Sequence, residues 1–338
     1  MPTDPLGGGK REETPDVMLF DAAESAVYAA AKGMLHPLES YFGTAESANR
    51  ADSYPGALNA VSALGHVWAV PLSFAPMVLA YDPATFAEAG VAPPAASWGW
   101  DEMAVACSEL TSARAKRYAL GPFDSLPNYV YQAGGSILTS DGTHSALTEP
   151  AALAGFSFYQ ELVQMRKVAA PRGGFTEGPP RRYGDNRVAL WAASIFDGVR
   201  PLNPYFRYGP PVHAKANANA ALASSVLTVT HAARDPRRSF AAVMALADAV
   251  QPRLIVPTRS IIAKQQSAQL YGGDEARSVI LSAAEGARAE PLDVDMFDAL
   301  GMAQQAIVTG VKDAAQAAMD SGSAIDRVLN DHYASATA

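Results

Sequence analysis

The chain has 338 residues, of which 49% are hydrophobic and 18% are charged, and its formal net charge is −8. This length suits about two domains, and the composition is typical of a globular protein rather than a disordered one. The acidic balance argues against nucleic acid as the main partner, because a phosphate backbone is bound by a cationic surface. No stretch reaches the roughly 18–20 consecutive apolar residues of a membrane span, and the first residues hold no apolar segment typical of a signal peptide. The single cysteine, Cys107, cannot form an internal disulfide.

The first half of the chain alternates short apolar runs with helical patterns. Residues 1–14, with three successive glycines, are predicted to be a flexible leader. The apolar run 16–20 predicts a buried strand, and Asp21, which closes it, is in position to cap a helix over 22–31. Because proline cannot donate to a sheet ladder, Pro71 predicts a crossing between domains. Further predicted elements are a helix over 54–65, strands over 67–72 and 77–81, and a helix over 100–110.

The second half continues the alternation and ends in helices. Thr148 is the predicted N-cap of a helix over 151–165. Asp293, Asp295 and Asp298 fit the start of a helix better than a metal site, because acidic residues are favoured there. The other predicted elements are strands over 187–191 and 221–230 and helices over 239–250, 275–289, 293–309 and 311–330. Strands that alternate with helices predict an α/β fold.

Several sequence blocks follow one another in the order found in a known family. The longest is VPLSFAPMVLAYDPATFAEAGVAPPAASWGW at 70–100. The others are TPDV at 14–17, KGMLHPL at 32–38, AGGSIL at 133–138, Gly184 with RVAL at 187–190, SSV at 224–226 and VPTR at 256–259. Together these blocks resemble the extracytoplasmic solute-binding proteins of sugar-type ABC importers. No block is specific alone; their common order across residues 14–260 carries the resemblance.

The resemblance implies a fold and a function. The expected fold is an α/β, two-lobe, periplasmic-binding-protein-like architecture with a hinge and a ligand cleft between the lobes. The first lobe would hold residues 1–72 and 226–270, and the second lobe residues 73–225 and 271–338. The implied function is the substrate-binding component of an ABC transporter, which binds a carbohydrate or related polyol and delivers it to a membrane permease. A membrane-associated periplasmic or extracellular monomer is implied, without catalysis, metal, cofactor or nucleic acid.

The same resemblance implies candidate ligand residues. A sugar site needs aromatic faces for stacking and polar groups for hydroxyls. Asp21 either accepts hydrogen bonds from ligand hydroxyls or caps the following helix. Ser73 and Phe74 lie at the first crossing, where they either contact ligand or pack in the hinge. At least one residue is expected to reach the cleft from the set Phe123, Asp124, Asn128 and Tyr129.

The remaining candidates lie in the last half of the chain. Phe196 and Asp197 follow the RVAL block, where the family often has a stacking tryptophan. Phe297 is near a second stacking position, with core packing as the alternative. Arg259 either donates to ligand oxygens or forms a salt bridge. Trp98 and Trp100 are implied to pack at a helix entry.

The chain departs from the family's pattern at its beginning. It starts near the family's second strand, so we expect an incomplete first lobe that lacks the first strand, the first helix and the signal peptide. A start assigned too late, a trimmed chain and a degenerate protein are the three explanations. Ser224 and Ser225 replace a common Gly-Gly pair, and the loop 205–219 is shorter than usual, which bears on the size of the ligand.

Two other functions remain open from the sequence. A carbohydrate-active enzyme would need two placed carboxylates, and the sequence holds none of the motifs G-x-S-x-G, H-E-x-x-H, G-x-x-x-x-G-K-[ST] or C-x-x-C. A degenerate binding protein with a sensory or structural role would fold poorly or bind no solute.

Overall fold

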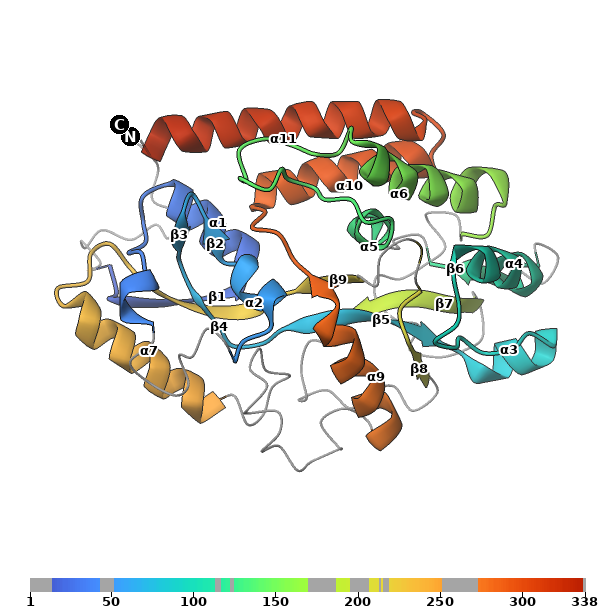
Figure 1. The fold of residues 1–338 in the computed structure, drawn as a ribbon, viewed down its shortest axis with the longest axis horizontal. Helices are drawn as coiled ribbons and strands as arrows, with labels where there is room; N and C mark the ends of the chain where they lie inside the picture. The colour runs from blue at the N-terminus through green and yellow to red at the C-terminus, as the bar shows by residue number, and fades with distance from the viewer. Residues whose placement is uncertain are drawn as a thin grey trace, which may run out of the picture.

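The computed structural model describes residues 14–42, 52–112, 117–121, 125–169, 187–194, 207–212, 214, 219–250 and 273–336. Strands and helices alternate along these ranges, so the predicted α/β class is confirmed (Figure 1). The strands form two larger sheets and one hairpin, and each larger sheet is the centre of one lobe.

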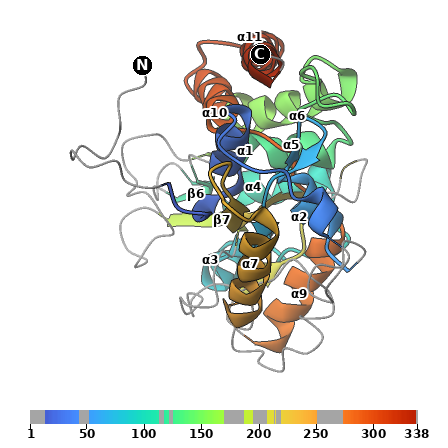
Figure 2. The same ribbon diagram turned by 90° about the vertical axis from the view of Figure 1, so that its left-hand side faces the viewer.

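The first lobe is built on a sheet with the strand order β1-β10-β4, in which both pairings are antiparallel. Phe20 of β1 packs with alanines of α1, whereas Val17 packs with the apolar cluster that holds α7. Figure 2 shows α1 above and α7 below the level of the strands. The elements are β1 (Val17–Ala22), α1 (Ala23–Ala31), the 3-10 turn η1 (Glu39–Tyr41), α2 (Pro55–Asn59), β2 (Ser62–Ala63), β3 (His66–Val67), β4 (Val70–Pro71), β10 (Ser224–Val229) and α7 (Pro236–Val250).

The second lobe is built on a sheet with the order β11-β9-β5-β7-β6, and β8 also pairs with β5. Its strands are β5 (Ala75–Tyr81), β6 (Arg117–Leu120), β7 (Arg187–Ser194), β8 (Arg207–Gly209), β9 (Asn219–Leu222) and β11 (Ala287–Arg288). Its helices are α3 (Pro83–Ala89), α4 (Trp100–Leu110), α5 (Leu126–Gln132), α6 (Pro150–Gln160) with a π-helical turn (Glu161–Met165), α9 (Asp274–Glu285), α10 (Val294–Val308) and α11 (Ala314–Ala336). Helix α11 lies along α10 and α6 and reaches α1 of the first lobe (Figure 1).

Two described connections cross between the lobes. Residues 72–74 lead from β4 to β5, and Ala223 separates β9 from β10. Pro71 pairs with Val226 at the edge of the first sheet, so the predicted crossing after this proline is found. The two crossings touch, because the Leu72 N–H donates to the Ser225 carbonyl at 2.8 Å. This is the arrangement of a two-strand hinge.

Several local predictions were wrong. Asp21 lies inside β1, and the N-cap of α1 is Ala22, which makes no side-chain capping bond. The N-cap of α6 is Glu149 rather than Thr148. The helix expected over 54–65 ends at Asn59 and is followed by the β2–β3 hairpin, whose two turn residues, Leu64 and Gly65, both have positive φ. The helix start predicted at Asp293 is confirmed, and the structure shows that Asp293 caps α10, since its carboxylate accepts from the Met296 N–H at 2.9 Å.

The strand expected over 221–230 is two strands, because the chain changes sheets within it. Ser225 has a φ of 55°, a left-handed conformation that suits glycine better than serine. We expect Ser225→Gly to raise the free energy of unfolding by about 1 kcal/mol, because it relieves this strain. Urea unfolding would measure it, with Ser224→Gly as the matched control in extended β10 backbone. If both variants lose stability equally, Ser225 is not strained.

Candidate functional site

The sequence-predicted ligand residues fall into two groups. Phe123, Asp124, Phe196, Asp197 and Arg259 lie outside the described residues. The other six are Asp21, Ser73, Phe74, Asn128, Tyr129 and Phe297. Of these six, Asp21 is exposed, Phe297 is half-buried against the second-lobe core, and the other four are buried.

Asp21 lies beside the hinge, near the end of β1. The register pairs Phe20 with Val226 and Ala22 with Ser224, which sets Asp21 opposite Ser225. Side chains alternate along a strand, and Val17 packs on the α7 side of the sheet while Phe20 packs on the α1 side. The Asp21 carboxylate therefore points to the α7 side.

Phe74, in the first crossing, is held by packing. Its ring stacks on Tyr54 with centroids 5.9 Å apart and an interplanar angle of 21°. Gly56 is required for this approach, because a Cβ there would lie 2.9 Å from the Phe74 ring and 2.6 Å from the Ala287 carbonyl oxygen. The neighbouring Ser73 is also buried. At this crossing the two lobes are therefore joined by apolar packing around Phe74.

Asn128 and Tyr129 face the interior of the second lobe. The Asn128 Oδ1 accepts a hydrogen bond from the Ala220 N–H at 2.9 Å and so ties α5 to β9. The Tyr129 ring lies 5.6 Å from Phe158 and 5.7 Å from Tyr159 between centroids. Both contacts place α5 for packing, and a role of either residue in ligand binding stays a prediction.

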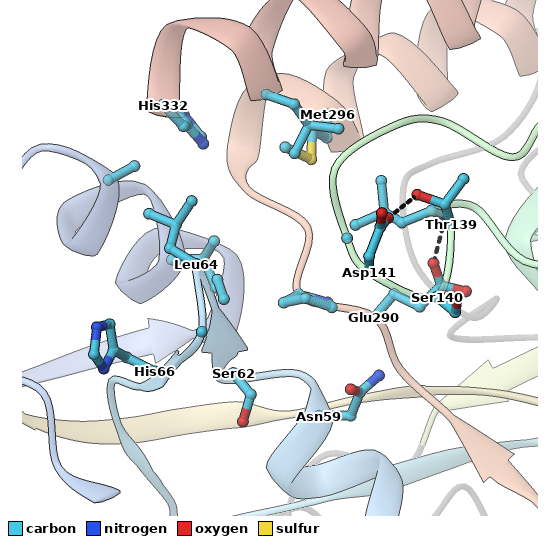
Figure 3. A pocket seen from close by; sticks show the side chains of 18 of the residues that line it. Asn59, Ser62, Leu64, His66, Thr139, Ser140, Asp141, Glu290, Met296 and His332 are labelled. Carbon is cyan, nitrogen blue, oxygen red and sulfur yellow. Dashed lines mark hydrogen bonds between the residues drawn. The ribbon is translucent and has the colours of Figure 1, made fainter. Parts of the chain in front are cut away.

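A pocket of about 510 Å³ lies between the two lobes (Figure 3). The first lobe contributes one flank of α1, the end of α2 and the β2–β3 hairpin. The second lobe contributes the loop 136–142, the segment 288–291 and parts of α10 and α11. No Phe, Tyr or Trp is among the described residues that line it, so the stacking surface expected of a sugar site is absent from this lining.

A buried carboxylate organises the second-lobe wall of the pocket. Glu290 accepts hydrogen bonds from the backbone N–H groups of Ile137, at 3.1 Å, and Leu138, at 2.6 Å. Burial raises the pKa of Glu290 above its ordinary range, against the lowering effect of these N–H donors. Burial also raises the pKa of Tyr131, with which Glu290 shares a hydrogen bond, well above its usual value. In this wall the loop that holds Ile137 and Leu138 is bonded to the buried carboxyl group of Glu290.

Arg288 completes the same wall. Its Nη1 donates to the Gly135 carbonyl at 2.9 Å, and its Nη2 donates to the Ser136 Oγ at 2.8 Å. The guanidinium carbon lies 4.9 Å from the Tyr131 ring centroid, and Nη2 lies 3.6 Å from the Glu290 carboxylate. Arg288 and Glu290 therefore attach β11 and the segment after it to the loop that follows α5 through several hydrogen bonds.

The first-lobe wall is the β2–β3 hairpin with the end of α2. Leu64 and Gly65 have φ values of 53° and 81°, the pattern of a type I′ turn, which favours Asn-Gly. His66 Nδ1 lies 2.5 Å from the Glu39 carboxylate, which lowers the pKa of Glu39 against a raising effect of burial. Asn59 Nδ2 donates to the Ala289 carbonyl at 2.7 Å and links the two lobes.

A buried contact between a histidine and an aspartate closes the end of the pocket nearest α11. His332 Nε2 lies 2.9 Å from the carboxylate of Asp293, and both side chains are almost fully buried. Because Asp293 also caps α10, this contact holds the C-terminal part of α11 against the start of α10. Within the described ranges, no group of three or more His, Cys, Asp or Glu side chains is placed to hold a metal ion.

Comparison with known families decides the class of this two-lobe protein. Residues 6–232 match the model of the bacterial extracellular solute-binding protein family. The chain belongs to this family. No curated protein sequence matches it.

Solved structures support the two-lobe fold of this solute-binding protein. The ABC substrate-binding protein Lmo0181 from Listeria monocytogenes, in complex with cycloalternan, is 18% identical, with 94% of this chain and 86% of that chain covered and a TM-score of 0.74. A solute-binding protein from Thermotoga lettingae bound to α-D-tagatose is 19% identical, with 93% and 85% covered and a TM-score of 0.68. UgpB from Mycobacterium tuberculosis, in complex with glycerophosphocholine, is 19% identical, with 95% and 85% covered and a TM-score of 0.69.

Among the helices that the structure describes, none is long and apolar enough to cross a membrane.

Sequence reasoning missed the residues that shape the interlobe pocket of this family member. Glu290 and Arg288 were included in, or next to, a predicted helix over 275–289. Gly65 was a usable signal, because a glycine between two short alternating runs is typical of a hairpin turn. No signal pointed to Asn59, whose partner Ala289 is 230 residues away in the chain.

The raised pKa of Glu290 gives a pH prediction. A carboxyl group whose folded pKa lies above its unfolded value stabilises the fold most below that unfolded value, near 4.5, and the contribution is lost as the pH rises through the folded pKa. The difference in unfolding free energy between wild type and Glu290→Gln should therefore decrease as the pH rises from below 4.5. Urea unfolding of both proteins between pH 4 and 8 measures it. A difference that grows with pH would mean that the backbone donors outweigh burial.

Proposed function

We propose that this solute-binding protein is the receptor of an ABC importer that binds a carbohydrate or related polyol between its lobes and delivers it to a membrane permease. The observation that carries the proposal is the match of residues 6–232 to the solute-binding family, on a fold whose two sheets are joined by touching crossings. Two proteins of similar fold form complexes with cycloalternan and with α-D-tagatose, which supports a carbohydrate as the ligand.

The proposed ligand site lies on the α7 side of the hinge, where Asp21 is exposed. Its carboxylate would accept hydrogen bonds from ligand hydroxyls. The burial of Phe74 and Tyr129 leaves Phe123, Phe196 and the half-buried Phe297 as the aromatic candidates for stacking. The polar candidates are Asp124, Asp197 and Arg259. Closure of the lobes about the hinge would then remove the ligand from water.

The remaining parts of the proposal follow the family. The protein would act as a monomer outside the cytoplasm, associated with the membrane through its permease. It would carry out no catalysis and bind no nucleic acid. A carbohydrate-active enzyme is the alternative, and it would convert an added oligosaccharide to new products.

A thermal-shift screen tests the function. The panel would hold cycloalternan, D-tagatose, glycerophosphocholine and a range of mono-, di- and oligosaccharides and polyols. A compound that binds the folded state alone adds about 2.7 kcal/mol of stability at a hundredfold excess over its Kd. A saturable upshift with a saccharide or polyol supports the proposal. A cooperative melt without any shift would contradict it, and chromatography of each mixture would reveal turnover by an enzyme.

Substitution of Asp21 tests the location of the site. We expect Asp21→Ala to weaken binding of the strongest panel compound about tenfold, because a hydrogen bond to a charged acceptor is lost. Isothermal titration calorimetry would measure the Kd. The matched control is Asp16→Ala, an exposed aspartate just before the other end of β1. Equal Kd values for both variants and wild type would place the ligand away from Asp21.

A further inference from the structure

Strand β1 is apolar, yet it is poorly covered at one edge of the first-lobe sheet. Its sequence is VMLFDA, and none of its six residues is buried. Leu19 is 58% exposed, whereas its cross-strand partner in β10, Leu227, is 5% exposed. Among the described residues, Met18 and Leu19 belong to none of the apolar clusters. A run that predicts a buried strand therefore leaves its apolar side chains partly in water.

The outer edge of β1 also presents backbone groups to its surroundings. In the described part of the chain, β1 pairs only with β10 (Figure 1). The Asp16 carbonyl accepts from the Thr230 N–H at 3.0 Å, so in this antiparallel ladder the even-numbered residues of β1 face β10 and the odd-numbered ones face away. The N–H and C=O groups of Val17, Leu19 and Asp21 therefore point to the outer edge.

The sequence of β1 contains none of the usual features that prevent an edge strand from pairing. Soluble proteins protect such strands with a lysine, a proline or a bulge. Strand β1 holds neither lysine nor proline. One register with β10 runs from Val17 to Ala22 without a bulge. The edge is therefore suited to accept a further strand.

The side chains along β1 define the kind of strand that fits beside it. Val17 and Leu19 present apolar surface on the α7 side of the sheet, and Met18 and Phe20 do so on the α1 side. A strand that meets apolar surface on both faces is apolar along its whole length rather than at every second residue. The fitting strand is thus a nearly continuous apolar run.

The charges at the two ends of β1 indicate basic residues in the partner. Asp16, just before β1, and Asp21, near its end, are both exposed, and the chain has a net charge of −8. Antiparallel pairing with β1 of a second copy would join two acidic chains and bring Asp16 and Asp21 together at each end. Opposite charges across a strand pair stabilise it, and like charges destabilise it. A segment with a basic residue at each end is therefore favoured over a second copy.

We propose that the outer edge of β1 is a docking site for an extended segment of another polypeptide, a run of about five apolar residues with a basic residue at each end. The segment adds to the first-lobe sheet as a further strand. Its backbone forms hydrogen bonds with Val17, Leu19 and Asp21, and its side chains cover Leu19. The site does not depend on the proposed function, since its tests use no solute.

Binding of a synthetic peptide tests the site. The probe is fluorescein-labelled KVITVIK, and fluorescence anisotropy with the full chain would measure its Kd. Saturable binding is expected, and Leu19→Lys should raise the Kd at least about tenfold, because it places a charge on the edge. Leu246→Lys, at another exposed leucine on α7, is the matched control and should leave the Kd unchanged. No saturable binding, or equal Kd values for Leu19→Lys and wild type, would overturn the inference.

Hydrogen exchange at single residues tests the pairing itself. In the free chain, the amide hydrogens of Val17, Leu19 and Asp21 should exchange faster than those of Met18 and Phe20, which face β10. The peptide should slow exchange at the first three residues at least about tenfold and leave the other two unchanged. Slow exchange at Leu19 in the free chain would overturn the inference, because the edge would then already be covered.

Two further peptides test what is recognised. EVITVIE, with acidic ends, should bind more weakly than KVITVIK, and Asp16→Lys should reduce this difference. KVITVIK with N-methyl groups on alternate residues loses the donors of one edge and should bind more weakly than the unmodified peptide. Equal binding of all three peptides would mean adsorption to an apolar surface and would contradict strand addition.

Sedimentation velocity of the free chain tests the competing occupant. The wild type and Leu19→Lys proteins should sediment alike, without dependence on concentration. A dimer that forms in the wild type and is lost in Leu19→Lys would assign the edge to a second copy and overturn the proposed partner.

Discussion

Replacing Tyr129 with alanine is expected to lower the free energy of unfolding by about 3–5 kcal/mol, the usual cost of deleting a buried aromatic ring. Tyr129 is only 1% exposed, and its ring packs on Phe158 and Tyr159. The backbone around it is equally tight, because a Cβ on Gly155 would lie 2.7 Å from the Tyr129 carbonyl. The surrounding residues can therefore move little into the cavity that the alanine leaves, and the full cost of the cavity remains.

Chemical denaturation and calorimetry together separate packing from ligand binding at Tyr129. The matched control, Tyr129→Phe, keeps the ring and loses only the hydroxyl, so it should cost about 1 kcal/mol. The Kd of the strongest panel compound should be unchanged in Tyr129→Phe. If Tyr129→Ala instead kept its stability and lost binding, Tyr129 would be a ligand residue and the packing interpretation would be wrong.

Elements with a strong local pattern could be predicted from the sequence. The apolar run before Asp21, the helix α4 and the acidic start of α10 at Asp293 are all found. Each depends on neighbours within a few residues, which is what periodicity and capping rules describe. Pro71 gave the place of a crossing for the same reason, since its missing N–H limits it to an edge.

Two of the errors lie where backbone conformation contradicts residue type. Leu64 and Ser225 adopt positive φ, although neither residue favours it. A helix was therefore predicted through the hairpin, and one strand was predicted across the change of sheets at Ala223, two residues before Ser225. At Ser225 the carbonyl accepts a hydrogen bond from the Leu72 N–H, more than 150 positions away in the chain, which no local pattern describes.

The candidate site could be predicted less well than the fold. Phe74 and Tyr129 have the same sequence character whether their rings face a cleft or a core, and only packing shows that they are buried. The wall formed by Arg288 and Glu290 joins residues about 150 positions apart, beyond the reach of any local pattern. The family resemblance supplied the fold and the two-lobe design, but it carried no information about this wall.

Removing the Glu290 carboxylate is expected to be the second largest effect. Glu290→Ala should lower the free energy of unfolding by about 3 kcal/mol, because the buried N–H groups of Ile137 and Leu138 lose their acceptor. Arg288 adds little to this loss, since its side chain is 37% exposed and water can replace the carboxylate. Urea unfolding at pH 7 would measure the loss.

Glu290→Gln is the matched control, because its amide oxygen still accepts from one of the two N–H groups and it carries no buried charge. We expect it to lose clearly less stability than Glu290→Ala. The loop 136–142 forms one wall of the interlobe pocket and is held there by Glu290, so the alanine variant should also exchange the amide hydrogens of Ile137 and Leu138 faster than wild type. Equal stability and equal exchange in the two variants would show that the loop is held by its other contacts, with Arg288 as the main one.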